Sequence, residues 1–430
     1  MRIAMLSWES LHSIAVGGVA AHVTELAAAL ERKGHHVHVF TRLSAGQLEY
    51  EEIHGVHYHR CAINLTVDFV DEINGMCSAF AHHFTVVEDR VGQFDIVHAH
   101  DWLAVNAMIW IKQGRGRRGV LTMHSTDYGR GGNVFHGGQC ERIRHQERAG
   151  TYWADRVIAV SHAMRDELMW MYEVPGDKVS VVYNGVSMHR FAGELDQGYV
   201  KQRYGIAPLD PTVLFCGRLV QQKGPDLMLE AAPHVLHFHP SAKFVFAGDG
   251  HLRHGLEYRA RELRIEHAVR LLGHREGGEL IELFKMCDAL CVPSRNEPFG
   301  IVVLEAWSAG KPVVATMNGG PNEYVRHGID GLKIYPHVDS VAWGLGTLMS
   351  DWNHAREMGE NGRQSVAESF TWDVIADRTI EIYESLPGMK KPRLHVKIAR
   401  RLKRAKQARQ IKSSRRSTHA RPRETVGSRR

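Results

Sequence analysis

The hydrophobic and polar positions of the first forty residues predict a strand, a loop, a helix and a second strand. Residues 2–8 are mostly apolar, and a loop over 9–16 leads to Gly17-Gly18. Gly34 ends the helix and residues 36–40 form the next strand. Apolar residues recur with helical period between the two strands, at Val19, Val23, Leu26 and Leu30. A crossover of this length predicts parallel strands.

Further apolar segments of strand length follow in the first half of the chain, at 95–98, 119–123, 156–161 and 179–183. Ligands of open α/β sheets bind at the carboxyl ends of the strands. Polar side chains stand at three of these ends, in His98-Ala99-His100-Asp101, His124-Ser125-Thr126-Asp127 and Ser161-His162.

The same alternation restarts after Asn184-Gly185 and a polar segment at 187–210. Strands are expected at 212–216, 243–247, 289–293 and 312–316, with a helix from Asp226. The repeat predicts two doubly wound, Rossmann-like α/β domains facing a central cleft. The expected divisions are an N-terminal domain at 1–186, a C-terminal domain at 187–370, a helix over 371–387 that returns to the first domain, and a tail at 388–430.

Composition agrees with a two-domain globular protein. A chain of 430 residues exceeds what one hydrophobic core usually serves, and it is 43% hydrophobic and 24% charged. No apolar run reaches the ~18 residues of a membrane span, and the N-terminus lacks a signal-peptide pattern. The six cysteines have no framework spacing, so we expect reduced thiols and a cytoplasmic protein.

Charge is concentrated at the C-terminal end. Residues 389–430 hold 17 Lys and Arg and one acid, Glu424, whereas the rest holds 37 bases and 47 acids. Such a tail has too few apolar groups to fold alone. It could be solvated, bind nucleic acid, or attach to an anionic membrane surface. We favour peripheral membrane attachment among the functional readings, because an acidic catalytic body has no evident use for nucleic acid.

The 29 histidines raise the question of a metal site. The groups His35, His36, His38 and His54, His57, His59 lie in or beside expected strands, and no carboxylate or cysteine accompanies them with metal-ligand geometry. We therefore expect no metal site. The sequence has no Asp-x-Asp pair, so a diphosphate would be neutralised by other groups.

The most informative motif is Glu297-Pro-Phe-Gly-Ile-Val-Val-Leu-Glu305. Pro298 and Gly300 mark a strand-to-helix turn. The spacing puts Glu297 at the loop tip and Glu305 about two turns along the helix, near the same cleft. The helix N-terminus at Phe299–Ile301 offers free N–H groups to a phosphate.

A second motif pairs two cations in one loop. Arg218 and Lys223 follow the strand at 212–216 and precede a helix, where a doubly wound domain binds its ligand. A guanidinium and an ammonium there can neutralise a diphosphate and stabilise it as a leaving group. The alternative, a solvated loop, is weakened by the glutamate motif in the same domain.

Other candidates are weaker alone. Gly17-Gly18 is a common strand-to-helix turn. Asp101 and His124 follow apolar strands of the first domain, though a histidine at such a place is more often structural.

Seven segments of the chain resemble, in order, the retaining glycosyltransferases of the glycogen synthase and sucrose synthase type. They are S-W-E…G-G-V…H-V-T-E-L, H-A-H-D-W, T-M-H-S-T-D-Y-G-R, F-C-G-R-L-V-Q-Q-K-G-P-D-L, A-G-D-G, E-P-F-G-I-V-V-L-E-A and F-T-W-D…Y. This family (family 4-like, group 1) has the two-domain fold called GT-B. The resemblance covers about residues 1–387.

The resemblance implies roles for single residues. Arg218 and Lys223 would bind the donor diphosphate, Glu297 the donor hexose and Glu305 the ribose hydroxyls. Catalytic roles would fall to His124, Glu297, Arg218 and Lys223. Residues implied to surround the donor and acceptor are Gly18 beside the phosphates, Phe299, Gly300 and Ile301 on the donor side, His124 beside the donor sugar, and Asp101 on the acceptor side.

Departures from the pattern bear on the substrates. Ala15-Val16 precedes Gly17-Gly18 where glycogen synthases usually have lysine, and Ser125 follows His124 where asparagine is frequent. Tyr183 and Ser187 replace a proline and an aspartate that many relatives have. These positions affect the expected acceptor and donor, and leave the diphosphate loop and paired glutamates intact.

The expected activity is therefore retaining transfer of a hexosyl group, glucosyl by preference, from a nucleotide-diphosphate sugar (UDP-, ADP- or GDP-hexose). The acceptor would be a sugar, glucan, lipid-linked carbohydrate or other hydroxyl, and no cofactor or essential metal is expected. The alternatives are a phosphorylase or sugar-nucleotide epimerase on the same fold, and a basic-tailed binding protein with an idle enzyme body. The intact set Arg218, Lys223, Glu297 and Glu305 argues against the last.

Overall fold

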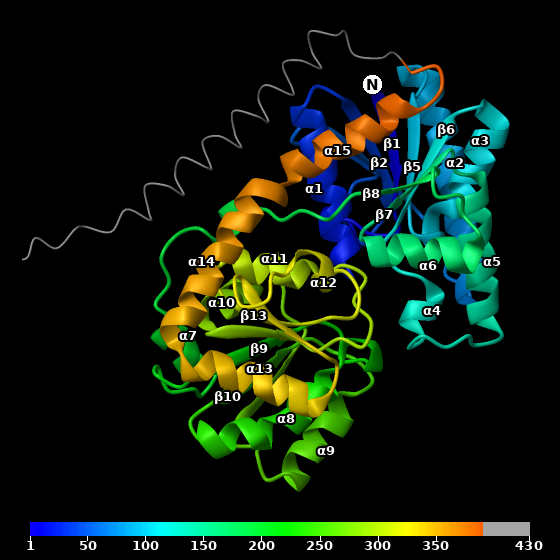
Figure 1. Ribbon diagram of the computed structural model, residues 1–430. Coiled ribbons are helices and arrows are strands. Elements are labelled where there is room, and N and C mark those ends of the chain that lie inside the picture. Colours follow the sequence, from blue (N-terminus) through cyan, green and yellow to red (C-terminus); the bar gives the residue numbers. More distant parts are fainter. Residues whose placement is uncertain (390–430) are drawn as a thin grey trace, which may run out of the picture. The chain divides into compact units, whose positions relative to one another are not determined.

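The computed structural model describes residues 1–389. Met1–Tyr383 forms one compact unit (Figure 1), and Glu384–Arg430 is a separate unit of which only the first six residues are described. The basic tail predicted at 388–430, with its membrane-binding interpretation, lies outside the described residues except for Gly388 and Met389.

The N-terminal half of this compact unit is built on one eight-stranded sheet. The strand order is β3-β4-β2-β1-β5-β6-β7-β8, and all neighbours are parallel except β3 and β4. The strands are β1 (Arg2–Leu6), β2 (His36–Arg42), β3 (Tyr50–Ile53), β4 (Val56–Cys61), β5 (Ile96–His100), β6 (Arg118–Met123), β7 (Arg156–Ala159) and β8 (Val179–Val181).

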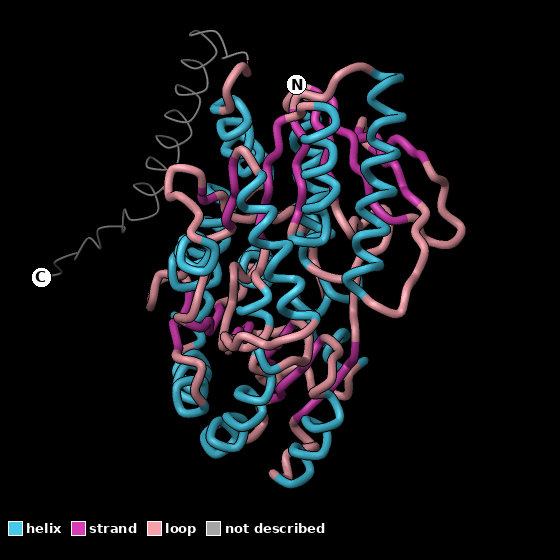
Figure 2. Tube along the Cα trace, turned by 90° about the vertical axis from the view of Figure 1, so that its right-hand side faces the viewer, coloured by secondary structure: helices cyan, strands magenta, loops and turns pink. Residues whose placement is uncertain are grey.

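Helices pack on this sheet, as the tube view in Figure 2 shows. They are α1 (Gly18–Arg32), α2 (Phe69–Val91), α3 (Val105–Arg115), α4 (Asp127–Arg130), α5 (Gln139–Trp153) and α6 (His162–Tyr172), with a 3₁₀ turn, η1, at Trp102–Ala104.

The second half repeats the plan with six parallel strands in the order β11-β10-β9-β12-β13-β14. The strands are β9 (Thr212–Cys216), β10 (Lys243–Ala247), β11 (Val269–Gly273), β12 (Ala289–Val292), β13 (Val313–Thr316) and β14 (Gly331–Ile334). The predicted fold class, two doubly wound α/β domains, is confirmed.

The helices of the second half are α7 (Gln197–Arg203), α8 (Pro225–Phe238), α9 (Arg253–Glu262), α10 (Gly277–Met286), α11 (Ile301–Ser308), α12 (Pro321–Tyr324), α13 (Val338–Ser350) and α14 (Trp352–Ser369). Two 3₁₀ turns, η2 (Met188–Phe191) and η3 (Gln221–Lys223), complete it.

Burial on both faces explains the apolar runs that predicted the strands. Residues 3–6 of β1 and 244–246 of β10 are fully buried. In a parallel sheet covered by helices, both faces of a strand exclude water, so its sequence reads as continuously apolar. These strands hold the loops at their carboxyl ends in place.

The last helix, α15 (Trp372–Ser385), contacts the N-terminal domain. Asp373 and Asp377 form ion pairs with Arg32 and Lys33 of the α1 end, at 2.9 and 2.8 Å. The buried hydroxyl of Tyr383 lies 2.6 Å from Nδ1 of His98. Exposed ion pairs contribute little, so we attribute most of the stabilisation to the buried side chains of α15.

Two features differ from the sequence analysis. The strand expected at 95–98 runs on to His100, so His98 and His100 are buried strand residues and not loop residues. The β3–β4 hairpin, β11 and β14 were not predicted as strands. Among the helices of residues 1–389, none has both the length and the apolar character needed to cross a membrane.

Candidate functional site

The glutamate motif lies where strand β12 passes into helix α11. Gly300 precedes the helix with φ of +85°, a conformation that side chains rarely adopt. The hydroxyl of Tyr324 donates to the Phe299 carbonyl at 2.6 Å and holds the turn. Leu304 and Trp307 are fully buried, which confirms the predicted inner face of α11.

Glu297 is held by a lysine from the neighbouring loop. The Lys223 ammonium donates to both carboxylate oxygens of Glu297, at 2.8 and 2.9 Å, and the Ser294 hydroxyl donates to Oε2 at 2.8 Å. The Glu297 side chain is only 5% exposed. A buried carboxylate needs such partners, so the two predicted motifs form one charged cluster.

The loop that carries Lys223 depends on one glycine. Gly224 has φ of +67°, and a Cβ there would lie 2.4 Å from the Pro293 carbonyl oxygen. Only glycine lets the loop after β9 approach the end of β12 this closely. The approach brings the Lys223 ammonium to the Glu297 carboxylate.

Arg218 lies in the same cluster, with its guanidinium 3.3 Å from the Gln222 side-chain oxygen. Burial lowers the pKa of Arg218, and the charge of Arg130 lowers it further, while Glu297 and Glu9 oppose the shift. Two like charges, Arg218 and Arg130, therefore act on each other across the domains. Such a pair is stabilised by an anion placed between them.

Glu305 lies further along α11 in a partly buried position. Burial raises the pKa of its carboxyl to about 7, and Arg190 of η2 opposes the shift. Among the described residues, no protein donor within hydrogen-bond distance of this carboxylate is recorded. It can therefore accept hydrogen bonds from the hydroxyls of a ligand.

The glycine loop of the N-terminal domain is fastened by Glu9. One Glu9 carboxylate oxygen accepts the N–H groups of Val16 and Gly17, both at 2.7 Å. A Cβ added to Gly18 would lie 3.2 Å from Ile301. The loop before α1 thus lies against the start of α11.

Asp101 holds the turn that carries His124. Its Oδ1 accepts the backbone N–H of His124 at 2.7 Å, and its φ is +58°, which is uncommon outside glycine. Burial raises the pKa of Asp101 to about 6 and lowers that of His124 to about 3. His124 is thus a neutral imidazole. The acceptor-side role of Asp101 stays a prediction.

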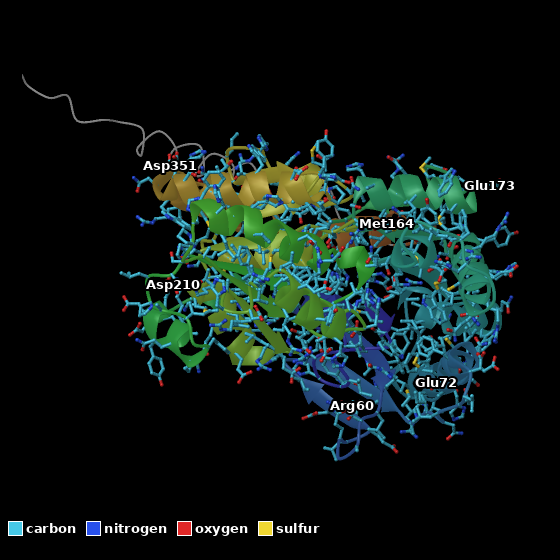
Figure 3. All side chains as sticks on the ribbon, turned by 90° about the horizontal axis from the view of Figure 1, so that it is seen from below. Arg60, Glu72, Met164, Glu173, Asp210 and Asp351 are labelled. Carbon is cyan, nitrogen blue, oxygen red and sulfur yellow. The ribbon has the colours of Figure 1, made fainter. Side chains whose placement is uncertain are left out.

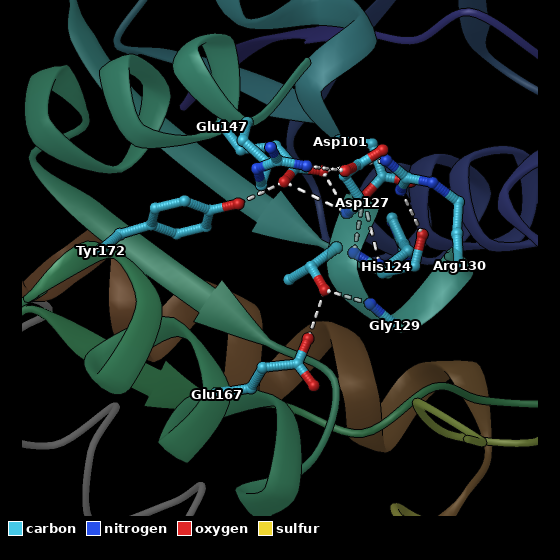
Figure 4. A network of polar contacts seen from close by, with 11 residues as sticks. Asp101, His124, Asp127, Gly129, Arg130, Glu147, Glu167 and Tyr172 are labelled. Carbon is cyan, nitrogen blue, oxygen red and sulfur yellow. Dashed lines mark hydrogen bonds and ion pairs between the residues drawn. The ribbon is translucent and has the colours of Figure 1, made fainter. Parts of the chain in front are cut away.

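A network of buried polar groups supports the same turn (Figure 4). Glu147 accepts hydrogen bonds from the Asp127 N–H at 2.9 Å, from Arg130 at 3.0 Å and from the Tyr172 hydroxyl. Arg130 also donates to the Ser125 hydroxyl at 2.8 Å. Satisfied buried networks rigidify their surroundings, so Arg130 is held where its charge acts on Arg218.

A cavity of about 230 Å³ opens beside Glu297. Residues of both domains line it, including Met164 of α6, labelled in Figure 3, and Asn296 of the glutamate loop. A larger cavity, about 410 Å³, lies among histidines of β2 and β4 and contains none of the predicted site residues. Because Glu297 lines the smaller cavity and no predicted site residue lines the larger one, we assign the smaller cavity to the candidate site.

The histidine groups differ from the sequence analysis. In the groups singled out there, His38 and His59 contact each other at 2.9 Å and their rings stack. Within residues 1–389, the set with metal-ligand spacing is instead His22, His100 and His124. The sequence alone could not predict that these three histidines come together, because they belong to three separate elements.

Several site residues were not predicted. Glu9 and Arg130 appear within the quoted S-W-E and T-D-Y-G-R segments but were given no role, and Glu147 and Arg190 were not considered. Of these residues, Arg130 alone has a local signal, since it precedes the pair Gly131-Gly132. Only tertiary contacts show which of them are buried and paired.

These features suit the binding of an anionic, hydroxyl-bearing ligand at the carboxyl ends of the strands of two doubly wound domains. Two family models match the chain: "Glycosyltransferase Family 4" over residues 16–190 and "Glycosyl transferases group 1" over residues 197–365.

Known proteins match over nearly the whole chain. An uncharacterized glycosyltransferase of Methanocaldococcus jannaschii is 35% identical over 89% of this chain and 98% of its own length. The glycogen synthase of Mycobacterium tuberculosis is 29% identical over 89% of this chain and 94% of its own. The chain therefore belongs to the group 1, family 4-like glycosyltransferases.

Solved structures show the same fold. Sucrose-phosphate synthase from Thermosynechococcus elongatus superimposes with a TM-score of 0.77, at 23% identity, over 90% of this chain and 98% of its own. Anabaena HepE, in complex with UDP and glucose, gives 0.73 at 21% identity over 90% and 100%. The fold is GT-B, and the protein is a glycosyltransferase.

Proposed function

We propose that the protein transfers a hexosyl group, glucosyl by preference, from a nucleoside-diphosphate hexose to a carbohydrate or other hydroxyl acceptor, with retention of the anomeric configuration. The observation that carries this proposal is the Lys223–Glu297 pair beside Arg218, at the carboxyl ends of β9 and β12. Anabaena HepE, which was solved with UDP and glucose, and the glycogen synthase of Mycobacterium tuberculosis support the donor class.

The donor diphosphate would bind to Arg218, Lys223 and the free N–H groups at the start of α11. Gly18, Phe299, Gly300 and Ile301 would line this part of the site. When the bond from the anomeric carbon to the phosphate breaks, the leaving diphosphate gains charge. Preorganised cations at that position stabilise the charge in the transition state.

The sugar and the nucleoside would be recognised by different carboxylates. Glu297, fixed by Lys223 and Ser294, would accept hydrogen bonds from hexose hydroxyls. Glu305 would accept hydrogen bonds from the ribose hydroxyls. His124 would lie beside the donor sugar. Asp101 would hold the turn that carries His124 and would lie on the acceptor side.

Retention would follow from attack on the same face that the diphosphate leaves. The acceptor oxygen forms the new bond to the anomeric carbon while the bond to the phosphate oxygen breaks. The acceptor hydroxyl proton passes to the departing phosphate oxygen. On this proposal the chemistry needs no cofactor, because the protein cations carry the leaving-group charge.

The experiment is a donor screen with the purified full-length chain. UDP-, ADP- and GDP-hexoses are tested with sugar and glucan acceptors, and released nucleotide is measured with the product's anomeric proton in NMR spectra. We expect acceptor-dependent release from one donor, with an α-linked product from an α-linked donor. Sugar phosphate formed from a glycoside and free phosphate would support a phosphorylase instead.

A further inference from the structure

Three histidines from separate elements meet beside the candidate site. His22 belongs to α1, His100 ends β5 and His124 follows β6. One ring nitrogen of each lies within 4.8 Å of the others, and His22 and His100 are buried. The centroid of the His22 ring is 4.5 Å from that of His124 and 5.3 Å from that of His100.

The spacing of two of these nitrogens already matches a shared metal ion. Nδ1 of His100 and Nε2 of His124 are 3.2 Å apart. Two imidazoles at 2.0–2.1 Å from one tetrahedral Zn²⁺ have nitrogens about 3.3 Å apart. The third nitrogen, from His22, lies within 4.8 Å of the other two.

One nitrogen of the proposed ligand set, Nε2 of His22, is buried without a protein partner. On His100 the buried nitrogen without a partner is Nε2, the outer nitrogen of the ring, whereas Nδ1 is the one beside His124. Nδ1 of His22 faces the Asn184 side-chain oxygen at 2.7 Å. Because that oxygen can only accept, it fixes the proton on Nδ1 and leaves a lone pair on Nε2. A hydrogen-bonded outer nitrogen of this kind orients histidine ligands of metal ions.

The surroundings define a set of three ligands. Both nitrogens of neighbouring His98 are engaged, one with the Tyr383 hydroxyl and one with the Thr122 hydroxyl, at 2.6 and 2.7 Å. Asp101, the nearest carboxylate along the chain, accepts the backbone N–H of His124. His124 is partly exposed and gives an ion a way in.

We propose that His22, His100 and His124 bind one Zn²⁺ ion, and that the bound ion inhibits glycosyl transfer. Three neutral imidazoles without a carboxylate suit Zn²⁺ and Co²⁺ and do not suit Mg²⁺ or Ca²⁺. Inhibition rests on the proposed function: a metal ion on Nε2 of His124 withdraws that nitrogen from the donor sugar. Binding itself is independent of that function.

The test measures metal binding by the full-length chain without substrate. The protein is stripped with a chelator, titrated with Co²⁺ while the visible absorption is recorded, and then titrated with Zn²⁺ to displace it. His22→Asn removes Nε2 and keeps an amide N–H for Asn184. His59→Asn is the matched control, because His59 also contacts a second histidine, His38. Thermal unfolding checks that both variants fold.

We expect one equivalent of Co²⁺ with the intense absorption of a tetrahedral site, displaced by Zn²⁺. Affinity should fall at least about tenfold in His22→Asn, since even outer-sphere changes cost 10–100-fold, and stay unchanged in His59→Asn. No binding by the wild-type chain, or loss in His59→Asn alone, overturns the site. If the site binds Zn²⁺ but the rate of glycosyl transfer does not change, the proposed inhibition is wrong and the proposed metal site is supported.

Discussion

The Lys223 ammonium lies 2.8 and 2.9 Å from the two carboxylate oxygens of Glu297 and thereby ties the loop after β9 to the loop after β12. These residues are 74 positions apart in sequence. The Glu297 side chain is nearly buried. Among residues 1–389, no carboxylate forms an ion pair with Arg218, whose guanidinium contacts the Gln222 side chain.

We predict that Glu297→Gln chiefly lowers kcat, whereas Glu305→Gln chiefly weakens nucleotide binding. On the proposed function, Glu297 would face the reacting sugar, whereas Glu305, about one turn into α11 (Ile301–Ser308), would face the ribose. Steady-state kinetics and calorimetric titration with the product nucleotide measure the two effects. Glu282→Gln, an exposed acid paired with Arg203, is the control. Unchanged nucleotide affinity in Glu305→Gln would contradict the assignment.

The raised pKa of Glu305 predicts a pH-dependent stability. The folded chain keeps this proton up to about pH 7, whereas the unfolded chain releases it at its ordinary value of 4.5. The contribution of this carboxyl to the free energy of unfolding is complete below pH 4.5 and is lost as the pH rises through 7. The side chain in Glu305→Gln stays neutral at every pH, so this variant does not lose that contribution as the pH rises.

Between about pH 4.5 and pH 8, the free energy of unfolding of Glu305→Gln should therefore rise by roughly 1–3 kcal/mol relative to the wild type, since one pKa unit is about 1.4 kcal/mol. Urea unfolding at both pH values measures it. A constant difference between the two proteins at both pH values would show that the carboxyl titrates normally.

Transfer should persist in excess EDTA. On the proposed function, the protein cations Arg218 and Lys223 would supply the charge that a metal ion would otherwise give the diphosphate. If the three-histidine site carries inhibitory Zn²⁺, the chelator raises the rate further. Complete loss of activity that returns with Mg²⁺ or Mn²⁺ would refute this expectation.

The basic tail at 388–430 should bind anionic membranes. Each Lys or Arg near such a surface contributes about 1 kcal/mol, and the attraction weakens in salt. Cosedimentation of the full chain and a 1–387 truncation with anionic and neutral vesicles, at low and high salt, measures it. Equal, salt-independent binding by both chains, or none by either, would end this hypothesis and leave the enzyme assignment standing.

The sequence predicted much of the fold because parallel strands are buried on both faces. The strands at 212–216 and 243–247 match β9 and β10 to the residue. The exposed strand β3, Tyr50–Ile53, carries two glutamates and has no apolar run, so its pairing with β4 was not visible. His100 belongs to β5 because it pairs with Thr122 of β6. The side chain of its neighbour His98 contacts Thr122 and Tyr383, the latter 285 residues away.

The candidate site divides in the same way. Motif spacing predicted that Arg218, Lys223, Glu297 and Glu305 lie in one region, because each follows a strand of the same sheet. The contacts that each of these residues makes could not be predicted from the sequence. That Lys223 pairs with Glu297, that Glu9 fastens the glycine loop, and that His22 meets His100 and His124 all depend on tertiary packing.

The central claim is that Arg218 and Lys223 stabilise a nucleoside diphosphate as it leaves the sugar. It is tested most directly by acceptor-dependent nucleotide release from the wild type, Arg218→Ala and Lys223→Ala. Lys285→Ala is the control, since this exposed lysine of the same domain bonds only backbone carbonyls. We predict a loss of more than about 10-fold in both site variants, as for other single leaving-group contacts, with unchanged thermal unfolding and a fully active control. Wild-type turnover in both site variants would contradict the account.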